Sequence, residues 1–122
     1  MCLVDQKLDP TAFYKCLADD TRLRCLLLIE QEQELCVCEL TQALNLSQPK
    51  ISRHLAQLRQ FGILQDTRRA KWVFYGIHPQ LADWAKTVLV QTLRANSDML
   101  AENNQQLNLM GDRPSRLQQC CN

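Results

Sequence analysis

The spacing of apolar residues predicts two helices in the first third of the chain. Aspartate caps helices and proline suits their first position, so Asp9-Pro10 marks one helix start. Asp19 can cap a second helix that follows directly. The apolar run 25–29 lacks flanking turn residues, which favours a buried helix over a strand. The inward positions of these helices are Phe13, Cys16, Leu17, Leu23, Leu26 and Leu27.

A helix-turn-helix pattern follows. A short helix over 37–44 is succeeded by a tight connection, and Ser47 can cap a longer helix that runs to about Phe61. Gly62 then suits the C-cap. The inward positions of the longer helix, at i, i+4 and i+7, are Ile51, Leu55 and Leu58.

Two strand-like segments come next, at 63–67 and 72–78. Apolar side chains alternate along the second segment, as they do in a strand with two distinct faces. The connection between the segments carries Arg68, Arg69 and Lys71. A basic hairpin after a helix-turn-helix is a wing, so the expected fold class is mainly α with a β-hairpin wing, a winged helix-turn-helix.

The longest predicted helix runs from Gln80 to about Asn104. Its apolar stripe, from Leu81 to Leu100, is longer than one small domain can cover, which favours burial against a second copy in a homodimer. Residues 105–122 are rich in Gln, Asn and Arg and predict a disordered tail. The expected division is therefore a DNA-binding and dimerisation domain over 1–104 and a tail over 105–122.

The positive charge of the chain is concentrated in one block. The net charge is only +1, but residues 47–78 hold a basic excess and residues 1–46 an acidic one. Such a block is what a surface facing the phosphates of double-stranded DNA requires, and charge alone is also consistent with a solvated basic face. Against the single Asp66, the block contains Lys50, Arg53, Arg59, Arg68, Arg69 and Lys71.

Composition also narrows the class of protein. No run of about 18 apolar residues is present, and the N-terminus has no secretory pattern, so we expect no membrane partner and a cytoplasmic location. The seven cysteines are an odd number, which argues against a disulfide framework and leaves core, ligand and redox roles. No phosphate loop or nucleophile elbow appears, so we do not expect an enzyme.

Three strings resemble one family. They are Leu-Ala-Asp-Asp-Thr-Arg at 17–22, Glu-Leu-Cys-Val-Cys-Glu-Leu at 34–40 and Ser-Gln-Pro-Lys-Ile-Ser-Arg-His-Leu at 47–55. With them, residues 10–100 resemble the ArsR family of metalloregulatory repressors, in its arsenic-responsive branch. The resemblance implies a winged-helix homodimer with its first and last helices at the dimer interface. It also implies an inverted-repeat operator over arsenic-resistance genes, released when trivalent arsenic or antimony binds cysteine thiolates.

The resemblance places the recognition helix near Gln48, and the residue pattern agrees. Glutamine and arginine can pair with base edges, whereas lysine more readily meets phosphate. His54 is expected to be a hydrogen-bonded structural residue. The candidate DNA-binding residues are Gln48, Pro49, Lys50, Ser52, Arg53 and Gln57, with Arg68, Arg69 and Lys71 on the wing.

Cys36 and Cys38 are the candidate ligands, because soft thiolates suit thiophilic ions and a helix start favours the thiolate form. In a regular helix residues i and i+2 point about 200° apart, so their sulfurs do not meet. If this turn is helical, chelation by both must unwind it, which would supply a switch.

The sequence departs from the family at Thr41, where the arsenic-responsive pattern often has a third cysteine. A third sulfur could come from Cys120 or Cys121, or from a small cellular thiol. The inducer could instead be a methylated or aromatic trivalent arsenical that needs only two thiolates. Cys16 and Cys25 fall in apolar stripes and are expected to fill the core.

Three other classes of protein share some of these features. A zinc, cobalt or nickel sensor would need histidines along the last helix, which has none. A redox-responsive repressor of the same fold is the stronger alternative, because thiols at a helix start are reactive. A thiol oxidoreductase would place the cysteine pair in a strand-rich α/β domain, unlike the pattern here.

Overall fold

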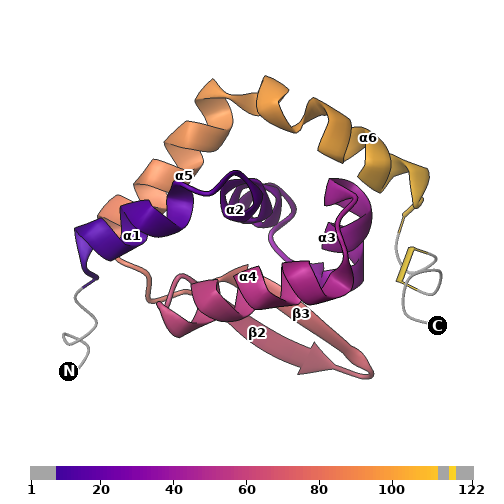
Figure 1. The fold of residues 1–122 in the computed structure, drawn as a ribbon, viewed down its shortest axis with the longest axis horizontal. Coiled ribbons are helices and arrows are strands. Elements are labelled where there is room, and N and C mark those ends of the chain that lie inside the picture. The colour runs from indigo at the N-terminus through magenta and orange to yellow at the C-terminus, as the bar shows by residue number, and fades with distance from the viewer. Residues whose placement is uncertain (1–7, 113–115, 118–122) are drawn as a thin grey trace.

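The first two helices begin where their caps predict. The computed structural model describes residues 8–112, 116 and 117 (Figure 1). Helix α1 spans Pro10–Leu17, and the Asp9 carboxylate accepts a hydrogen bond from the Thr11 N–H. Helix α2 spans Asp20–Glu32, and the Asp19 carboxylate accepts from the Arg22 N–H. Local capping chemistry therefore fixes both starts.

Replacing Asp19 by alanine is expected to destabilise the fold by about 1 kcal/mol, because the start of α2 loses its cap. The hydrogen bond from the Arg22 N–H holds the pKa of the Asp19 carboxyl below its ordinary value. The carboxylate therefore stabilises the fold above the unfolded-state pKa, and this contribution is lost as pH falls through the folded-state pKa. Denaturant unfolding at neutral and acid pH measures both effects. Asp19→Asn keeps the acceptor, so a loss equal to that of alanine would contradict the capping role.

The helix-turn-helix is formed by α3 and α4, at Val37–Leu44 and Gln48–Gln60. Asn45 takes the left-handed conformation with φ 56°, which turns the chain between them. The Ser47 hydroxyl accepts from the Lys50 N–H and caps α4. The predicted inward residues are fully buried: Ile51, Leu55 and Leu58.

The wing is a longer hairpin than predicted. Strand β2 spans Leu64–Arg69 and pairs antiparallel with β3, Trp72–Ile77. The strand therefore includes Arg68 and Arg69, and the turn is reduced to Ala70 and Lys71, with Ala70 at φ 56°. A two-residue turn with positive φ suits the twist of a hairpin. The helix-turn-helix and this wing confirm the winged-helix fold.

The sheet also has a third strand that the sequence pattern did not predict. Strand β1 is only Leu35–Cys36, and it pairs antiparallel with β3 in the order β1-β3-β2. Leu35 lies opposite Tyr75, and Cys36 lies opposite Phe74. Two residues cannot show a period of two, so only the pairing partner identifies this strand. Its effect is to join the segment before α3 to the wing.

The single long helix predicted over 80–104 is wrong. Helix α5 spans Asp83–Ala95, a 3₁₀ turn η2 spans Ser97–Leu100, and α6 spans Ala101–Leu109. The break is at Asn96, whose φ of −132° and ψ of 36° are not helical. Its side-chain amide and its backbone N–H both donate to the Thr92 carbonyl. Figure 1 shows α5 and α6 arching over α2 with this break between them.

The boundary predicted at residue 104 also needs correction. Helix α6 continues to Leu109, and Arg116 and Leu117 are buried against the rest of the chain. Residues 105–112, 116 and 117 therefore belong to the folded domain. The remaining part of the predicted tail, 113–115 and 118–122, lies outside the described residues.

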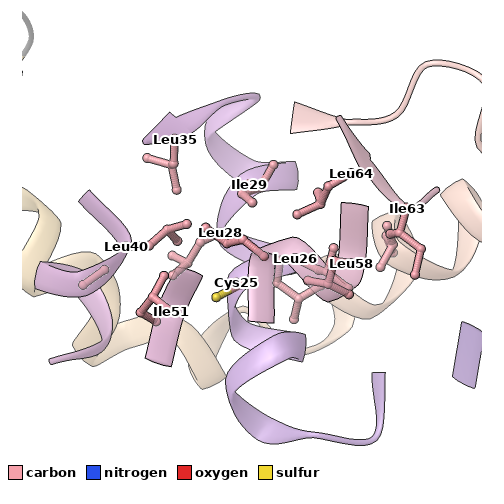
Figure 2. Packing of buried hydrophobic residues seen from close by; sticks show 14 of the residues in the cluster. Cys25, Leu26, Leu28, Ile29, Leu35, Leu40, Ile51, Leu58, Ile63 and Leu64 are labelled. Carbon is pink, nitrogen blue, oxygen red and sulfur yellow. The ribbon is translucent and has the colours of Figure 1, made fainter. Parts of the chain in front are cut away.

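The core is built around α2, which lies in the middle of the other helices (Figure 1). Its run Cys25–Ile29 is fully buried, as the sequence predicted for a buried helix segment. Figure 2 shows these side chains meeting Leu58, Ile63 and Leu64 on one side and Leu35, Leu40 and Ile51 on the other. Among the described residues, no helix is long and apolar enough to cross a membrane.

Part of the apolar stripe after residue 80 is buried within the chain itself. Ala85, Leu89 and Leu100 are fully buried in the same core cluster as α2. The expectation that the whole stripe packs against a second copy is therefore wrong for these residues. The large apolar side chains that stay exposed on α5 and the neighbouring α1 are aromatic. Trp84 on α5 is 39% exposed, and Tyr14 on α1 is 51% exposed.

Candidate functional site

The two cysteines of the Cys-x-Cys string lie with their sulfurs together. The Sγ atoms of Cys36 and Cys38 are 3.3 Å apart. Cys36 is buried and Cys38 partly buried. A helical turn would keep the sulfurs apart, but Cys36 is the N-cap of α3, with φ −92° and ψ 168°. The expectation that chelation must unwind α3 does not hold for this geometry, because the pair is already formed.

Two interactions hold Cys36 outside the helix. Its backbone pairs with β3 opposite Phe74, which fixes an extended conformation. Its N–H donates to Oε1 of Glu39 at 2.9 Å, three residues into the helix. A carboxylate at this position that reaches back to the cap N–H is one half of a capping box. Strand pairing and capping thus combine to place one sulfur over the other.

The Glu39 carboxylate is itself buried, and it forms an ion pair with a distant residue. Its side chain is 0% exposed, and Oε2 accepts from Arg116 Nη1 at 3.1 Å. A buried carboxylate is costly unless it is paired and hydrogen-bonded. The pairing therefore ties the start of α3 to the end of the described chain.

The other described cysteines are unsuited to bind an ion. Cys16 and Cys25 are buried, as predicted for core residues. Burial raises the pKa of the Cys25 thiol to about 12, and burial also raises that of Cys16. Both stay protonated at neutral pH, whereas the thiolate is the form that binds metals.

A third ligand is not supplied by the part of the chain that the structure describes. Within residues 8–112, 116 and 117, no three His, Cys, Asp or Glu side chains cluster as a metal site. The Thr41 hydroxyl, at the position of the absent cysteine, donates to the Cys38 carbonyl at 2.8 Å. Cys120 and Cys121, the predicted candidates, lie outside the described residues.

Cys38 is disulfide-bonded in this structure. Its Sγ lies 3.3 Å from that of Cys36, which is too long for a covalent bond between these two sulfurs.

The recognition helix presents its predicted residues outward. Ser52 is half-buried, and the others on α4 are exposed: Gln48, Pro49, Lys50, Arg53 and Gln57. Gln57 is not wholly available, because its Oε1 accepts a hydrogen bond from Arg22 Nη1 at 3.1 Å. The remaining exposed positions, Gln48, Pro49, Lys50 and Arg53, lie in the first half of α4.

Arg22 is a residue whose role sequence reasoning missed. Its Nε donates to the Cys16 carbonyl, its Nη2 to the Lys15 carbonyl, and its Nη1 lies 3.4 Å from His54 Nδ1. Arg22 therefore connects α1, α2 and α4 beside the recognition surface. His54 has the structural role predicted for it, and desolvation by burial is the largest cause of its lowered pKa. Arg22 is the last residue of the string at 17–22 that resembles the family. Its spacing along α2 could not reveal its hydrogen-bond partners on α1 and α4.

The wing residues divide into two groups. Arg68 and Lys71 are exposed, and the Lys71 Nζ lies 5.3 Å from the centre of the Trp72 ring. Arg69 instead forms an ion pair with Glu34 through both nitrogens, one at 3.0 Å, and stacks over Phe74. Arg69 thus links the wing to the residue just before β1.

The comparisons with known proteins extend over most of the chain. A sequence model described as "Bacterial regulatory protein, arsR family" matches residues 19–66. The chain is 55% identical over 107 residues to the arsenic resistance transcriptional regulator ArsR1 of Pseudomonas putida, covering 88% of this chain and 84% of the relative. It is 42% identical over 106 residues to the arsenical resistance operon repressor of Escherichia coli, covering 84% and 91%. Among solved structures, the AntR antimony-specific transcriptional repressor matches with a TM-score of 0.60 at 27% identity, covering 72% of this chain and 77% of that chain.

Proposed function

Because the chain belongs to the arsR family of bacterial regulatory proteins, we propose that it represses arsenic-resistance genes until trivalent arsenic or antimony binds Cys36 and Cys38. The observation that carries the proposal is the 3.3 Å separation of the two sulfurs beside the wing. The relatives named for arsenic resistance and for antimony support the class of inducer.

The chemistry of the pair suits a thiophilic ion. Soft thiolates prefer soft ions, and two sulfurs that already lie 3.3 Å apart can share one ion. Both cysteines lie at the start of α3, where the partial positive charge of the helix attracts negative charge. Chelation requires reduced sulfurs, so the disulfide at Cys38 must be opened before the inducer binds.

The thiol pair lies in two elements, β1 and α3, that connect to the two parts of the candidate DNA surface. Cys36 is in β1, which pairs with β3 of the wing, and the preceding Glu34 holds Arg69. Cys38 is in α3, the first helix of the helix-turn-helix that ends in α4. An inducer that binds better to a shifted arrangement of β1 and α3 would lower the population of the DNA-binding arrangement. By linkage, operator DNA must weaken inducer binding by the same factor.

The function is tested by operator binding of the reduced protein, measured with a phosphine reductant that leaves no competing thiol. Arsenite and antimonite are expected to release the operator at concentrations at which zinc does not. Release by zinc at the same dose, or retention of DNA at saturating arsenite, would contradict the proposal.

Two protein sulfurs are enough for an arsenical that carries one carbon substituent. Thr41 donates its hydroxyl to a backbone carbonyl and is a poor ligand. The proposal therefore includes methylated or aromatic trivalent arsenicals beside arsenite, with no resident cofactor. X-ray absorption of the arsenic-bound protein counts the sulfur neighbours: two support an organic inducer, and three require a further thiol.

A redox-responsive repressor is the second candidate, and the disulfide at Cys38 is the observation that favours it. A reactive thiol at a helix start is readily oxidised. If peroxide releases the operator from the reduced protein and arsenite does not, this second function replaces the first.

On the DNA side, Arg53→Ala is expected to weaken operator binding by about 1–3 kcal/mol and to relax discrimination at one base position. Arg53 is exposed on the outward face of α4, where it can reach a base edge. Lys71→Ala should weaken all sequences alike and reduce the salt dependence, as expected for a phosphate contact. Binding titrations on operator and scrambled DNA at several salt concentrations separate the two effects. An unchanged operator affinity in Arg53→Ala would refute its base-reading role.

We also propose that two copies associate through α1 and α5. The rings of Tyr14 and Trp84, one from each helix, lie 6.1 Å apart on the exposed side, and Trp84 packs edge-on against the buried Phe13. Exposed aromatic side chains are enriched in the cores of protein interfaces. A dimer would place two copies of α4 on successive half-sites about one DNA turn apart.

A further inference from the structure

Two residues near the C-terminus lie against the thiol site, although about 80 residues separate them from it in the sequence. Arg116 and Leu117 are 9% and 7% exposed. Leu117 packs in one cluster with Cys36 and Phe74, bordered by Cys38 and Trp72. The end of the described chain therefore covers the sulfur pair.

One carboxylate connects Arg116 to the first ligand. Glu39 Oε2 accepts from Arg116 Nη1 at 3.1 Å, while Oε1 accepts from the Cys36 N–H at 2.9 Å. The Arg116 side chain is held in turn, because its Nε donates to the Gly111 carbonyl at 2.9 Å. The chain of contacts thus runs from the turn after α6, through Arg116 and Glu39, to the backbone of Cys36.

Because the ion pair between Arg116 and Glu39 is buried, its loss should affect the conformation of Cys36. The side chains of Arg116 and Glu39 are 11% and 0% exposed, so the pair is shielded from water. Removing one partner of a buried pair leaves the other charge poorly compensated. Without Arg116, the Glu39 carboxylate loses a buried charged hydrogen-bond donor, so its position and its hydrogen bond with the Cys36 N–H should become less well fixed.

We propose that Arg116 is a positioning residue of the inducer site, which acts through Glu39 to hold Cys36 in its extended N-cap conformation. This inference rests on the proposed role of Cys36 and Cys38. In that conformation the sulfur of Cys36 meets that of Cys38. If Cys36 instead joined α3, the two side chains would point about 200° apart and could not share one ion.

The test is the arsenite dose that releases half of the operator from full-length variants. Arg116→Ala is expected to raise this dose about tenfold, corresponding to the loss of one charge-assisted hydrogen bond. Operator affinity without arsenite should stay near that of the wild type, since the hydrogen bonds of Arg116 go to Glu39 and Gly111 and not to a candidate DNA-binding residue. Arg116→Lys keeps the charge and should show a smaller increase, which guards against a folding defect in the alanine variant.

The decisive variant is the double substitution Glu39→Gln with Arg116→Ala. Glutamine keeps an oxygen for the Cys36 N–H but carries no charge, so Arg116 is no longer needed. The release dose should return to within about twofold of the wild type. A role of Arg116 in packing alone predicts no such rescue.

A readout without arsenic is the alkylation rate of Cys36 in the reduced protein, resolved by peptide mass spectrometry. The rate should rise in Arg116→Ala and return toward the wild-type rate in the double variant. The inference is overturned if Arg116→Ala releases DNA at the wild-type dose, or if the double variant is as impaired as Arg116→Ala. Failure of the proposed function itself would differ, because Cys36→Ser would then respond like the wild type.

Discussion

Replacing Cys36 or Cys38 by serine is expected to leave operator binding near the wild-type affinity and to abolish release at arsenite doses that free the wild type. Serine is nearly the same size, so strand pairing at Cys36 and the start of α3 should persist. What is lost is one of two soft ligands that lie 3.3 Å apart. Binding then falls from two joined contacts to one, and the required arsenite concentration should rise by at least about 100-fold.

The matched controls are the two buried cysteines. Cys16→Ser and Cys25→Ser should release the operator at the wild-type dose, because both thiols are buried and their pKa values are raised. Their only expected defect is lower stability, since a hydroxyl in the core costs free energy. If Cys36→Ser leaves DNA at the wild-type dose, the sulfur pair is not the sensor. If only Cys38→Ser fails to respond, a site centred on Cys38 replaces the pair.

Replacing Trp84 by glutamate is expected to give a folded monomer that has lost at least about 100-fold in operator affinity, because two half-sites can no longer be bound together. Trp84 is 39% exposed within one chain, so the substitution leaves the core around α2 in place. It puts a charge at the centre of the proposed contact between α1 and α5, beside Tyr14. Sedimentation gives the mass, and a mobility shift gives the affinity.

The matched control is Lys86→Glu, on the other flank of α5. Lys86 donates to the Pro79 carbonyl of its own chain, so its replacement should leave the mass and the operator affinity near those of the wild type. Circular dichroism of both variants checks that α5 is retained. A dimer that persists in Trp84→Glu would move the interface elsewhere. Leu89 is unsuitable for this test because it is fully buried within one chain, and a charge there would unfold the protein.

The sequence predicted the helix-turn-helix and the hairpin because their signals are local. A cap such as Asp19 or Ser47 acts on backbone groups within one turn. The inward stripe of α4 and the buried run of α2 follow from helical spacing. The Cys-x-Cys string could be identified as a candidate site for the same reason, because its two cysteines are close together in the sequence.

The errors in the prediction arose where a distant partner decides the conformation. The short strand at Leu35–Cys36 exists because β3 offers it backbone partners, and no periodicity of two residues can reveal that. The helix break at Asn96 leaves α6 free to pack on α3, where Asn103 donates to the Ala43 carbonyl. A continuous helical pattern gives no sign of such a turn, so the predicted boundary at 104 came too early.

By itself the sequence predicted most of the elements, the basic block and the two candidate sulfur ligands, since each depends on neighbouring residues or on composition. Only the tertiary structure decided how the sulfurs meet. Cys36 is kept out of the helix by its pairing with Phe74 and by Glu39, and Glu39 is in turn paired with Arg116. A buried charge must find its counterion wherever the fold brings one, and that partner came from 77 positions away in the chain.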